Sequence, residues 1–284
     1  MADGLLDDIA DRGADGSAVE FMHDFAYLLP VTVICELIGI PESDREAFRP
    51  VARNLAAVFE NTTDEDLPRI NDAAVELLAY FSALAKVKRT SPGDDLLTDL
   101  LAIAESGDGR LTDAELLHNL TLLLVAGFET TTNLLGNGLH VVLADPSASA
   151  AVADGSVPAT AFVEEVLRYD SPVQLTSRIG YDTKLNQVKI TENSSLVTLL
   201  GAGNRDPRRF TDPSRFDPAR TDGGTLSFGG GAHFCIWAAL ARLEATVAFP
   251  RLFGRFPKIE AAGQPTRRDA MVLRGFDALP ITVA

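Results

Sequence analysis

The chain has 284 residues, and 46% of them are hydrophobic, which is enough to bury a sizeable core in one or two domains. Its 40 acidic side chains outnumber the 25 basic ones, and the net charge of −15 argues against a general binder of nucleic acid or of an anionic membrane. The two cysteines, Cys35 and Cys235, lie far apart in unlike contexts, which favours a reducing compartment over a disulfide scaffold. The sequence shows neither a secretory leader nor a membrane span, so we expect a cytoplasmic protein.

Helical spacing of apolar residues dominates the first part of the chain. It predicts helices over 3–12, 27–40, 42–60, 66–89 and 94–105. Cys35 lies in the apolar run 31–40 of the second of these helices, where we expect it to be part of the core.

A long central helix is predicted over 113–144. Thr112 and Glu115 form a capping box at its start, and Asp145-Pro146 ends it. At about 1.5 Å per residue, such a helix would span roughly 48 Å. Its middle, 120–128, is apolar on nearly every side, which predicts that the helix is buried.

The second half of the chain mixes helices with short strands. Helices are predicted over 147–154, 158–169 and 238–253. Segments 184–191 and 195–200 alternate around the turn 192–194, which predicts a strand pair, and a last strand ends at 283. An irregular stretch, 204–224, is long enough to suggest a function. We therefore expect one domain over 1–284 that is mainly α with minor β (α+β).

The most informative segment is a glycine turn, 228–237, that presents one cysteine just before an apolar helix. Gly229, Gly230 and Gly231 allow positive φ and a close approach of the backbone to a flat ligand. The amides of the turn and of the next helix favour negative charge on the sulphur of Cys235, which we expect to be a thiolate. Taken alone, the segment also fits a buried cysteine beside an ordinary glycine-rich turn.

The central helix carries a second unusual cluster, Ala126-Gly127-Phe128-Glu129-Thr130-Thr131. Gly127 costs about 1 kcal/mol of helix stability relative to alanine, and a buried Glu129 must be paired, protonated or hydrated. These residues favour a local helix distortion that admits a small ligand, with an acid and an alcohol that relay protons. Alternatively, the threonines bond back to the preceding turn and Glu129 is a solvated surface acid.

A third pattern is Glu165-Val166-Leu167-Arg168, which places an acid and a base at i and i+3 on one helix face. Taken alone, this is a common surface pair that contributes under about 1 kcal/mol. A functional role for this pair can be inferred only together with the cysteine turn 228–237 and the cluster 126–131.

Together, these residues resemble the cytochrome P450 family of haem-thiolate monooxygenases, in its bacterial soluble form. The resemblance runs from about Leu5 to the last strand, with the oxygen-binding helix, the Glu-x-x-Arg pair and the cysteine loop in the family's order. The segments 204–207 and 213–218 resemble the family's irregular meander. The resemblance implies a P450-like helical fold with a long central helix, in which the family's N-terminal sheet and first helices have no counterpart.

The resemblance also implies the cofactor and the residues around it. Cys235 would be the iron ligand of haem b, with Phe228 in the same loop, and Arg178 and His233 would donate to the haem propionates. Ala126 and Gly127 would line the oxygen groove.

Further roles follow from the same resemblance. Glu129 and Thr130 would be the catalytic acid and alcohol that deliver protons during dioxygen activation. Glu165, Arg168 and Arg215 would form a buried charge triad with a structural role. Gln174 and Leu175 would face the substrate.

The implied activity is oxidation, such as hydroxylation, of a small organic molecule in secondary metabolism. Electrons would come from NAD(P)H through a ferredoxin and a ferredoxin reductase. Trp237, the single tryptophan, stands where the family has glycine, so it either displaces the porphyrin or rotates outward. This departure and the missing N-terminal portion leave an alternative: a haem-free, repurposed protein that is a non-redox enzyme or an accessory partner of a biosynthetic enzyme.

Overall fold

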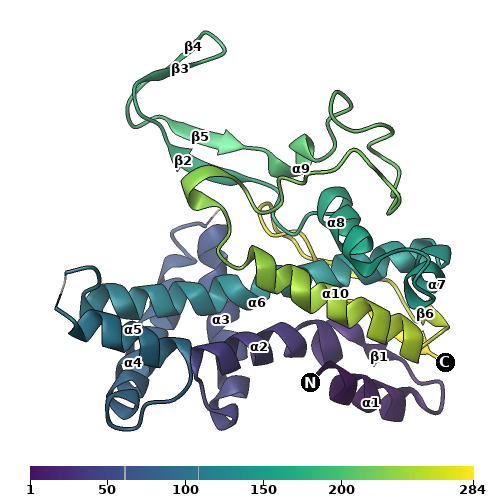
Figure 1. Cartoon of the computed structure of the whole chain (residues 1–284), viewed down its shortest axis with the longest axis horizontal. Helices are drawn as coiled ribbons and strands as arrows, with labels where there is room; N and C mark the ends of the chain where they lie inside the picture. Colours follow the sequence, from purple (N-terminus) through teal and green to yellow (C-terminus); the bar gives the residue numbers. More distant parts are fainter. Residues whose placement is uncertain (61, 108) are drawn as a thin grey trace. The chain divides into compact units, whose positions relative to one another are not determined.

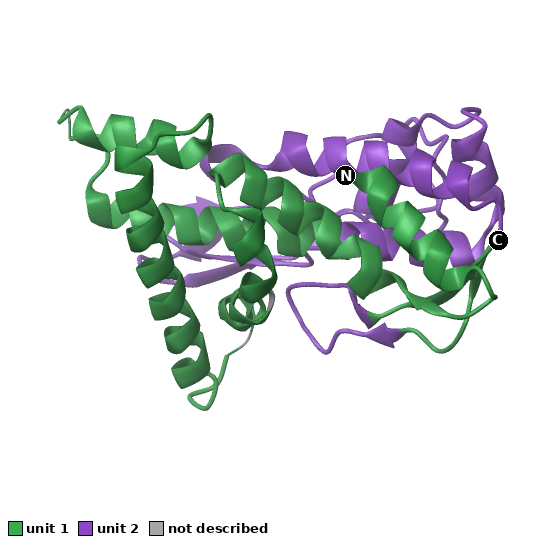
Figure 2. Cartoon of the chain, turned by 90° about the horizontal axis from the view of Figure 1, so that it is seen from below, with its two compact units in different colours: residues 1–133, 259–265, 278–284 green, residues 134–258, 266–277 purple. Residues whose placement is uncertain are grey.

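The computed structural model describes residues 1–60, 62–107 and 109–284, without the side chain of Arg49 (Figure 1). The chain forms two compact units, which Figure 2 distinguishes by colour. Unit 1 contains Met1–Asn133, Ile259–Pro265 and Ala278–Ala284, and unit 2 contains Leu134–Lys258 and Thr266–Asp277. The single domain expected from the sequence stays a prediction.

Unit 1 is built mainly from helices. They are α1 (Ala2–Gly13), α2 (Leu28–Ile38), α3 (Phe48–Ala56), α4 (Leu67–Thr90), α5 (Leu96–Glu105) and the first part of α6 (Asp113–Ala144), together with a π-helical turn η1 (Met22–Ala26). Local capping explains two of these boundaries. Asp95 accepts a hydrogen bond from the Thr98 N–H at 2.9 Å to start α5, and Gly39, at φ 93°, ends α2 in the left-handed region.

The helix expected over 42–60 is wrong in its extent. The segment forms a 3₁₀ helix η2 (Glu42–Ala47), then α3, then a second 3₁₀ helix η3 (Ala57–Phe59). Pro50 gives the physical reason, because it has no N–H to donate to the Glu46 carbonyl and its ring crowds that carbonyl. An α-helix can therefore start only shortly before this proline.

The central helix α6 has the bounds and the cap that the sequence predicts. Thr112 Oγ1 accepts from the Glu115 N–H at 3.2 Å, and Glu115 Oε2 accepts from the Thr112 N–H at 2.9 Å. Within unit 1, a Cβ added at Gly127 would lie 2.7 Å from Cγ1 of Ile34 on α2. Gly127 is therefore needed for the close packing of α2 against α6.

The core of unit 1 includes Cys35, as expected, and burial raises the pKa of its thiol to about 12. Phe128 of α6 packs edge-on against Tyr27, with ring centroids 5.5 Å apart. A small antiparallel sheet in the order β1–β9–β6 adds the strands β1 (Val19–Glu20), β9 (Pro280–Val283) and β6 (Ile259–Ala261).

Unit 2 combines helices with two-stranded ribbons. Its helices are the rest of α6, α7 (Ser147–Ala153), α8 (Ala159–Tyr169), α9 (Leu200–Gly203) and α10 (Ala238–Arg255), with a 3₁₀ turn η4 (Gly231–His233). Phe162 of α8 packs against Phe249 and Phe253 of α10, at centroid distances of 4.9 and 5.8 Å. These fully buried rings hold α8 and α10 together.

The strand pairing expected over 184–191 and 195–200 is wrong. Positive φ at Asn186 and Gln187, 45° and 69°, folds the first segment into a tight hairpin of β3 (Thr183–Leu185) and β4 (Val188–Ile190). The strand β5 (Ser195–Thr198) instead pairs antiparallel with β2 (Thr176–Ile179). A third ribbon joins β7 (Thr266–Arg267) to β8 (Phe276–Ala278).

The irregular stretch 204–224 is confirmed as a chain of turns without a regular helix or strand. The fold is mainly helical with minor sheet, as the sequence predicts. No helix in the described part of the chain combines the length and the apolar character needed to cross a bilayer.

Candidate active site

The cysteine turn in unit 2 is closed by its own backbone. Gly229 and Gly231 have φ of 68° and 67°, in the left-handed region that favours glycine. The Cys235 N–H donates to the Phe228 carbonyl at 3.0 Å, and the Phe234 N–H donates to the Gly231 carbonyl at 3.0 Å. The loop therefore folds back on itself and delivers Cys235 to the start of α10.

The sulphur of Cys235 lies in a mixed environment. Burial raises the pKa of its thiol, whereas the N–H groups of Trp237 and Ala238 and the charge of Arg242 lower it. Burial is the largest of these effects, so the protein alone favours the thiol. This is contrary to the expectation that the turn by itself makes a thiolate.

Arg242 of α10 ties the turn to α8. Its guanidinium lies 4.3 Å from the centroid of the Phe228 ring, and it forms an ion pair with Glu164. Phe228 therefore has a defined structural partner in addition to its expected place beside the cofactor.

The surroundings of Cys235 fit a flat apolar macrocycle whose metal ion would be held by the cysteine sulphur. Cβ atoms added at Gly230 and Gly231 would meet nothing within 4 Å, so open space lies above the turn. Phe234 and Ile236, on either side of the cysteine, are 54% and 74% exposed, as expected for a surface made to receive an apolar ligand.

The two residues expected to bind the propionates, Arg178 and His233, are exposed to solvent. Arg178 on β2 is exposed and donates from Nη1 to its neighbour's carbonyl, that of Ser177, at 2.7 Å, and His233 is exposed on η4. Trp237 is partly buried, with φ −89° and ψ 7°, a conformation open to any residue. The roles of Arg178 and His233 toward propionates stay predictions.

The expected proton-relay residues lie on α6 within unit 1. Glu129 is only 6% exposed, so the alternative of a solvated surface acid is wrong. Thr130 Oγ1 donates to the Ala126 carbonyl at 3.3 Å, which confirms that this threonine bonds back to the preceding turn. The helix α6 runs without a break through Ala126 and Gly127, which does not support the expected local distortion.

Gln174 stands in a tightly bonded turn of unit 2. Its backbone N–H donates to the Val272 carbonyl at 2.9 Å, and its Nε2 donates to the Ser171 carbonyl at 2.7 Å. The substrate-facing role of Gln174 and Leu175 stays a prediction.

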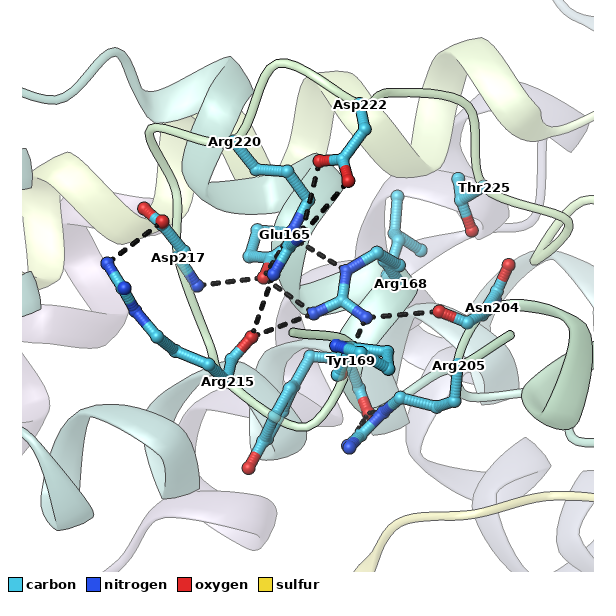
Figure 3. A network of polar contacts seen from close by, with 12 residues as sticks. Glu165, Arg168, Tyr169, Asn204, Arg205, Arg215, Asp217, Arg220, Asp222 and Thr225 are labelled. Carbon is cyan, nitrogen blue, oxygen red and sulfur yellow. Dashed lines mark hydrogen bonds and ion pairs between the residues drawn. The ribbon is translucent and has the colours of Figure 1, made fainter. Parts of the chain in front are cut away.

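The Glu165–Arg168 pair is the centre of a buried network, not a surface pair (Figure 3). The two side chains are 4% and 3% exposed, and two parallel bonds of 2.7 Å join them. The remaining donors of Arg168 reach the carbonyls of Asn204, Pro213 and Arg215 at 3.0, 2.9 and 3.0 Å. One buried guanidinium thus fixes three points of the irregular stretch.

The expected triad of Glu165, Arg168 and Arg215 is wrong in its third member, Arg215. The side chain of Arg215 is 68% exposed and pairs with Asp217, so only its backbone carbonyl belongs to the network. Arg220 takes its place, because it is 8% exposed and its Nε lies 3.4 Å from Glu165 (Figure 3). Both arginines lie in the irregular stretch 204–224, so residue type alone does not distinguish them.

Glu244 on α10 is a buried acid that the sequence analysis missed. It is 6% exposed, and neither carboxyl oxygen has a hydrogen-bond partner among the described residues. Burial raises its pKa to about 8, so the group is protonated at neutral pH. Its spacing from the buried Ala241 and Ala248 is the signal that could have revealed it.

We expect Glu244 to make folding pH-dependent. The unfolded carboxyl ionises near its model value of 4.5, whereas the folded one keeps its proton up to a pH of about 8. The folded state binds more protons between these values, so stability should fall as pH rises through this window, by about 1.4 kcal/mol per pH unit. Urea unfolding at a series of pH values should show a smaller slope for Glu244→Gln. The exposed Glu192→Gln is the control, and an unchanged slope in E244Q would contradict a neutral buried acid.

Comparisons with known proteins agree with this fold. Residues 159–273 match the family model described as Cytochrome P450. Cytochrome P450 107B1 of Saccharopolyspora erythraea is 41% identical over 283 residues, which cover 98% of this chain and 68% of that protein. The 6-deoxyerythronolide B hydroxylase of the same organism is 37% identical over 281 residues, with the same two coverages, 98% and 68%. Ligand-free CYP164A2 of Mycobacterium smegmatis has a TM-score of 0.93 at 40% identity, over 99% of this chain and 72% of that one.

A mainly helical fold with a cysteine on a glycine turn and a buried Glu-x-x-Arg pair defines the class of haem-thiolate proteins. The chain belongs to the cytochrome P450 family. It spans about two thirds of the length of these relatives, 68% of the two curated ones. The expectation that only part of the family's pattern is matched is thereby confirmed.

Proposed function

We propose that the chain is a haem-thiolate monooxygenase that oxidises a small organic molecule. The observation that carries the proposal is Cys235, held by a closed glycine turn with open space above it and apolar side chains around it. The similarity to a protein named as a hydroxylase supports the same type of reaction.

In this proposal, each part of the site has its own task. Cys235 holds haem b through the iron, and the N–H groups of Trp237 and Ala238 stabilise negative charge on its sulphur. Arg178 and His233 are the donors for the two carboxylates of the porphyrin. Bound haem would supply the iron on which dioxygen is activated.

On α6, Glu129 and Thr130 would hold and pass the protons that this chemistry consumes. The small side chain of Ala126 would leave room for a small ligand beside the helix, whereas Ile34 of α2 occupies the space next to Gly127. Electrons would come from NAD(P)H through a ferredoxin and its reductase in the cytoplasm. The substrate would be a small molecule of secondary metabolism, and the similarity to 6-deoxyerythronolide B hydroxylase supports hydroxylation as the reaction.

A haem-free function is the second candidate, and two observations favour it. Burial keeps the Cys235 sulphur as a thiol in the protein alone, and the bulky Trp237 follows it closely. Titration of the purified protein with haemin separates the candidates. A monooxygenase should bind one haem per chain tightly, whereas a haem-free protein should stay folded and colourless.

Thr130→Ala should uncouple electron use from product formation. Loss of the hydroxyl removes the alcohol of the relay, so we expect about a tenfold larger share of NADPH to be consumed without product. The measurement compares NADPH oxidation with product and peroxide yields, using a substrate found by its shift of the haem spectrum. Thr121→Ala is a matched control, because Thr121 Oγ1 makes the same kind of bond, to the Leu117 carbonyl at 3.0 Å. Unchanged coupling in T130A would contradict the relay.

A further inference from the structure

Unit 2 contains a cavity of about 310 Å³ at the C-terminal ends of α6 and α8. Four basic or imidazole side chains contribute to its wall: Arg205, Arg267, Arg274 and His140. Val141, Ala144, Tyr169 and Phe216 contribute apolar atoms, Asp145 and Asp170 contribute carboxylates, and the rings of Tyr169 and Phe216 lie edge to face at 5.5 Å. None of these residues belongs to the cysteine turn.

The arginines of this cavity outnumber the carboxylates that could neutralise them. Asp170, 7% exposed, holds two of them, with Arg274 Nε at 2.5 Å and Arg267 Nη2 at 3.0 Å. Arg205 has no carboxylate partner among the described residues. Its guanidinium stacks 3.8 Å from the Tyr169 ring centroid and donates from Nε to the Tyr169 carbonyl at 3.0 Å. In a chain with a net charge of −15, this is a local excess of positive charge.

Two other acceptor groups near the cavity have hydrogen-bond partners. Asp145 also lines the cavity, but its Oδ1 accepts from the N–H and the hydroxyl of Ser147 at 3.1 and 2.6 Å. The carbonyl of Asp170, at the end of α8, accepts from Asn137 Nδ2 at 2.9 Å. Among the carbonyls at the end of α8, that of Tyr169 accepts from Arg205 and that of Asp170 accepts from Asn137, so neither accepts from Arg274.

Two side chains that line the cavity, Arg274 and His140, have nitrogen atoms without a hydrogen-bond partner among the described residues. Arg274 is 48% exposed and bonds through Nε, and neither of its Nη atoms donates to a described residue. His140 has a buried Nδ1 without a hydrogen-bond partner among the described residues, and its ring lies 4.7 Å from that of Phe276. Burial and the charges of Arg267 and Arg274 lower the pKa of His140, while Asp170 raises it, so the ring is neutral at pH 7.

We propose that this cavity binds a small organic anion, a carboxylate or a phosphate monoester on an apolar body, with the free Nη fork of Arg274 as its anchor. A guanidinium fork matches both kinds of anion in a bidentate arrangement. Tyr169 and Phe216 supply the apolar side on which the body of the ligand packs. The proposal goes beyond oxidation of a substrate and does not depend on haem binding.

Calorimetry at pH 7 and constant ionic strength tests the site with phenyl phosphate and benzoate as probes. We expect saturable binding of one probe per chain, tighter for phenyl phosphate than for inorganic phosphate, and no binding of neutral benzyl alcohol. The two probes distinguish the phosphate from the carboxylate as the preferred head group. Absence of saturable binding for both probes would overturn the proposal.

Variants locate the binding. Arg274→Gln should weaken probe binding about tenfold or more, because it removes the charged fork. Arg208→Gln is the control, since Arg208 is 89% exposed and does not line the cavity. Probe binding that is equal in R274Q and the unaltered protein would also overturn the proposal.

A second readout needs no stable R274Q variant. Because a bound anion favours the imidazolium, the ring resonances of His140 should shift with the probe and its pKa should rise. His140→Gln assigns those resonances. Resonances that stay fixed at saturating probe would place the binding elsewhere and refute the site.

Discussion

Cys235→Ser should abolish the thiolate signature of the haem protein without unfolding the chain. A serine hydroxyl is a far weaker iron ligand, so the reduced carbon monoxide complex should lose the red-shifted Soret band from which the family takes its name. The turn itself should persist, because the Cys235 N–H and the glycines that close it are unchanged. We expect the free energy of unfolding without haem to change by less than about 1 kcal/mol.

The other cysteine supplies the control for this experiment. Cys35→Ala removes a fully buried thiol in unit 1 and should lower stability, yet it should leave the Soret band of the reconstituted protein in place. If C235S keeps the red-shifted band, Cys235 is not the iron ligand. If the unaltered protein binds no haem under any condition, the monooxygenase proposal fails and the haem-free candidate remains.

Arg168→Ala should have the largest effect on folding. It leaves Glu165 buried without its bidentate partner and removes the donor to three backbone carbonyls. Breaking a buried pair in this way costs about 3–5 kcal/mol, a large share of the stability of an ordinary domain. Urea unfolding followed by circular dichroism should show a strongly lowered midpoint or no cooperative transition.

Three further arginines test the composition of this network. Arg208→Ala removes an exposed arginine paired with Asp206 and should shift the midpoint little. Arg220→Ala should be clearly more destabilising than Arg215→Ala, because Arg220 lies beside Glu165 and Arg215 is exposed. Equal effects of R215A and R220A would contradict the corrected triad.

Local features of this chain could be predicted from the sequence because neighbouring residues determine them. The capping box of Thr112 and Glu115, the 113–144 extent of α6 and the glycine turn before Cys235 all depend on contacts within a few residues. The order of the three motifs was enough to indicate the family, which the relatives confirm. The broad fold class followed from periodicity, as did the core position of Cys35.

Only the tertiary structure decided which of several similar residues joins the buried Glu165–Arg168 network. Arg215 and Arg220 are alike in type and setting, and only packing buries Arg220 beside Glu165 while Arg215 points to solvent. The hairpin of β3 and β4 depends on a left-handed turn at Asn186 and Gln187, and β5 pairs with β2, a register that the alternating pattern alone does not encode. The protonation of Cys235 and Glu244 depends on burial, because a charge loses its hydration only when the fold closes around it.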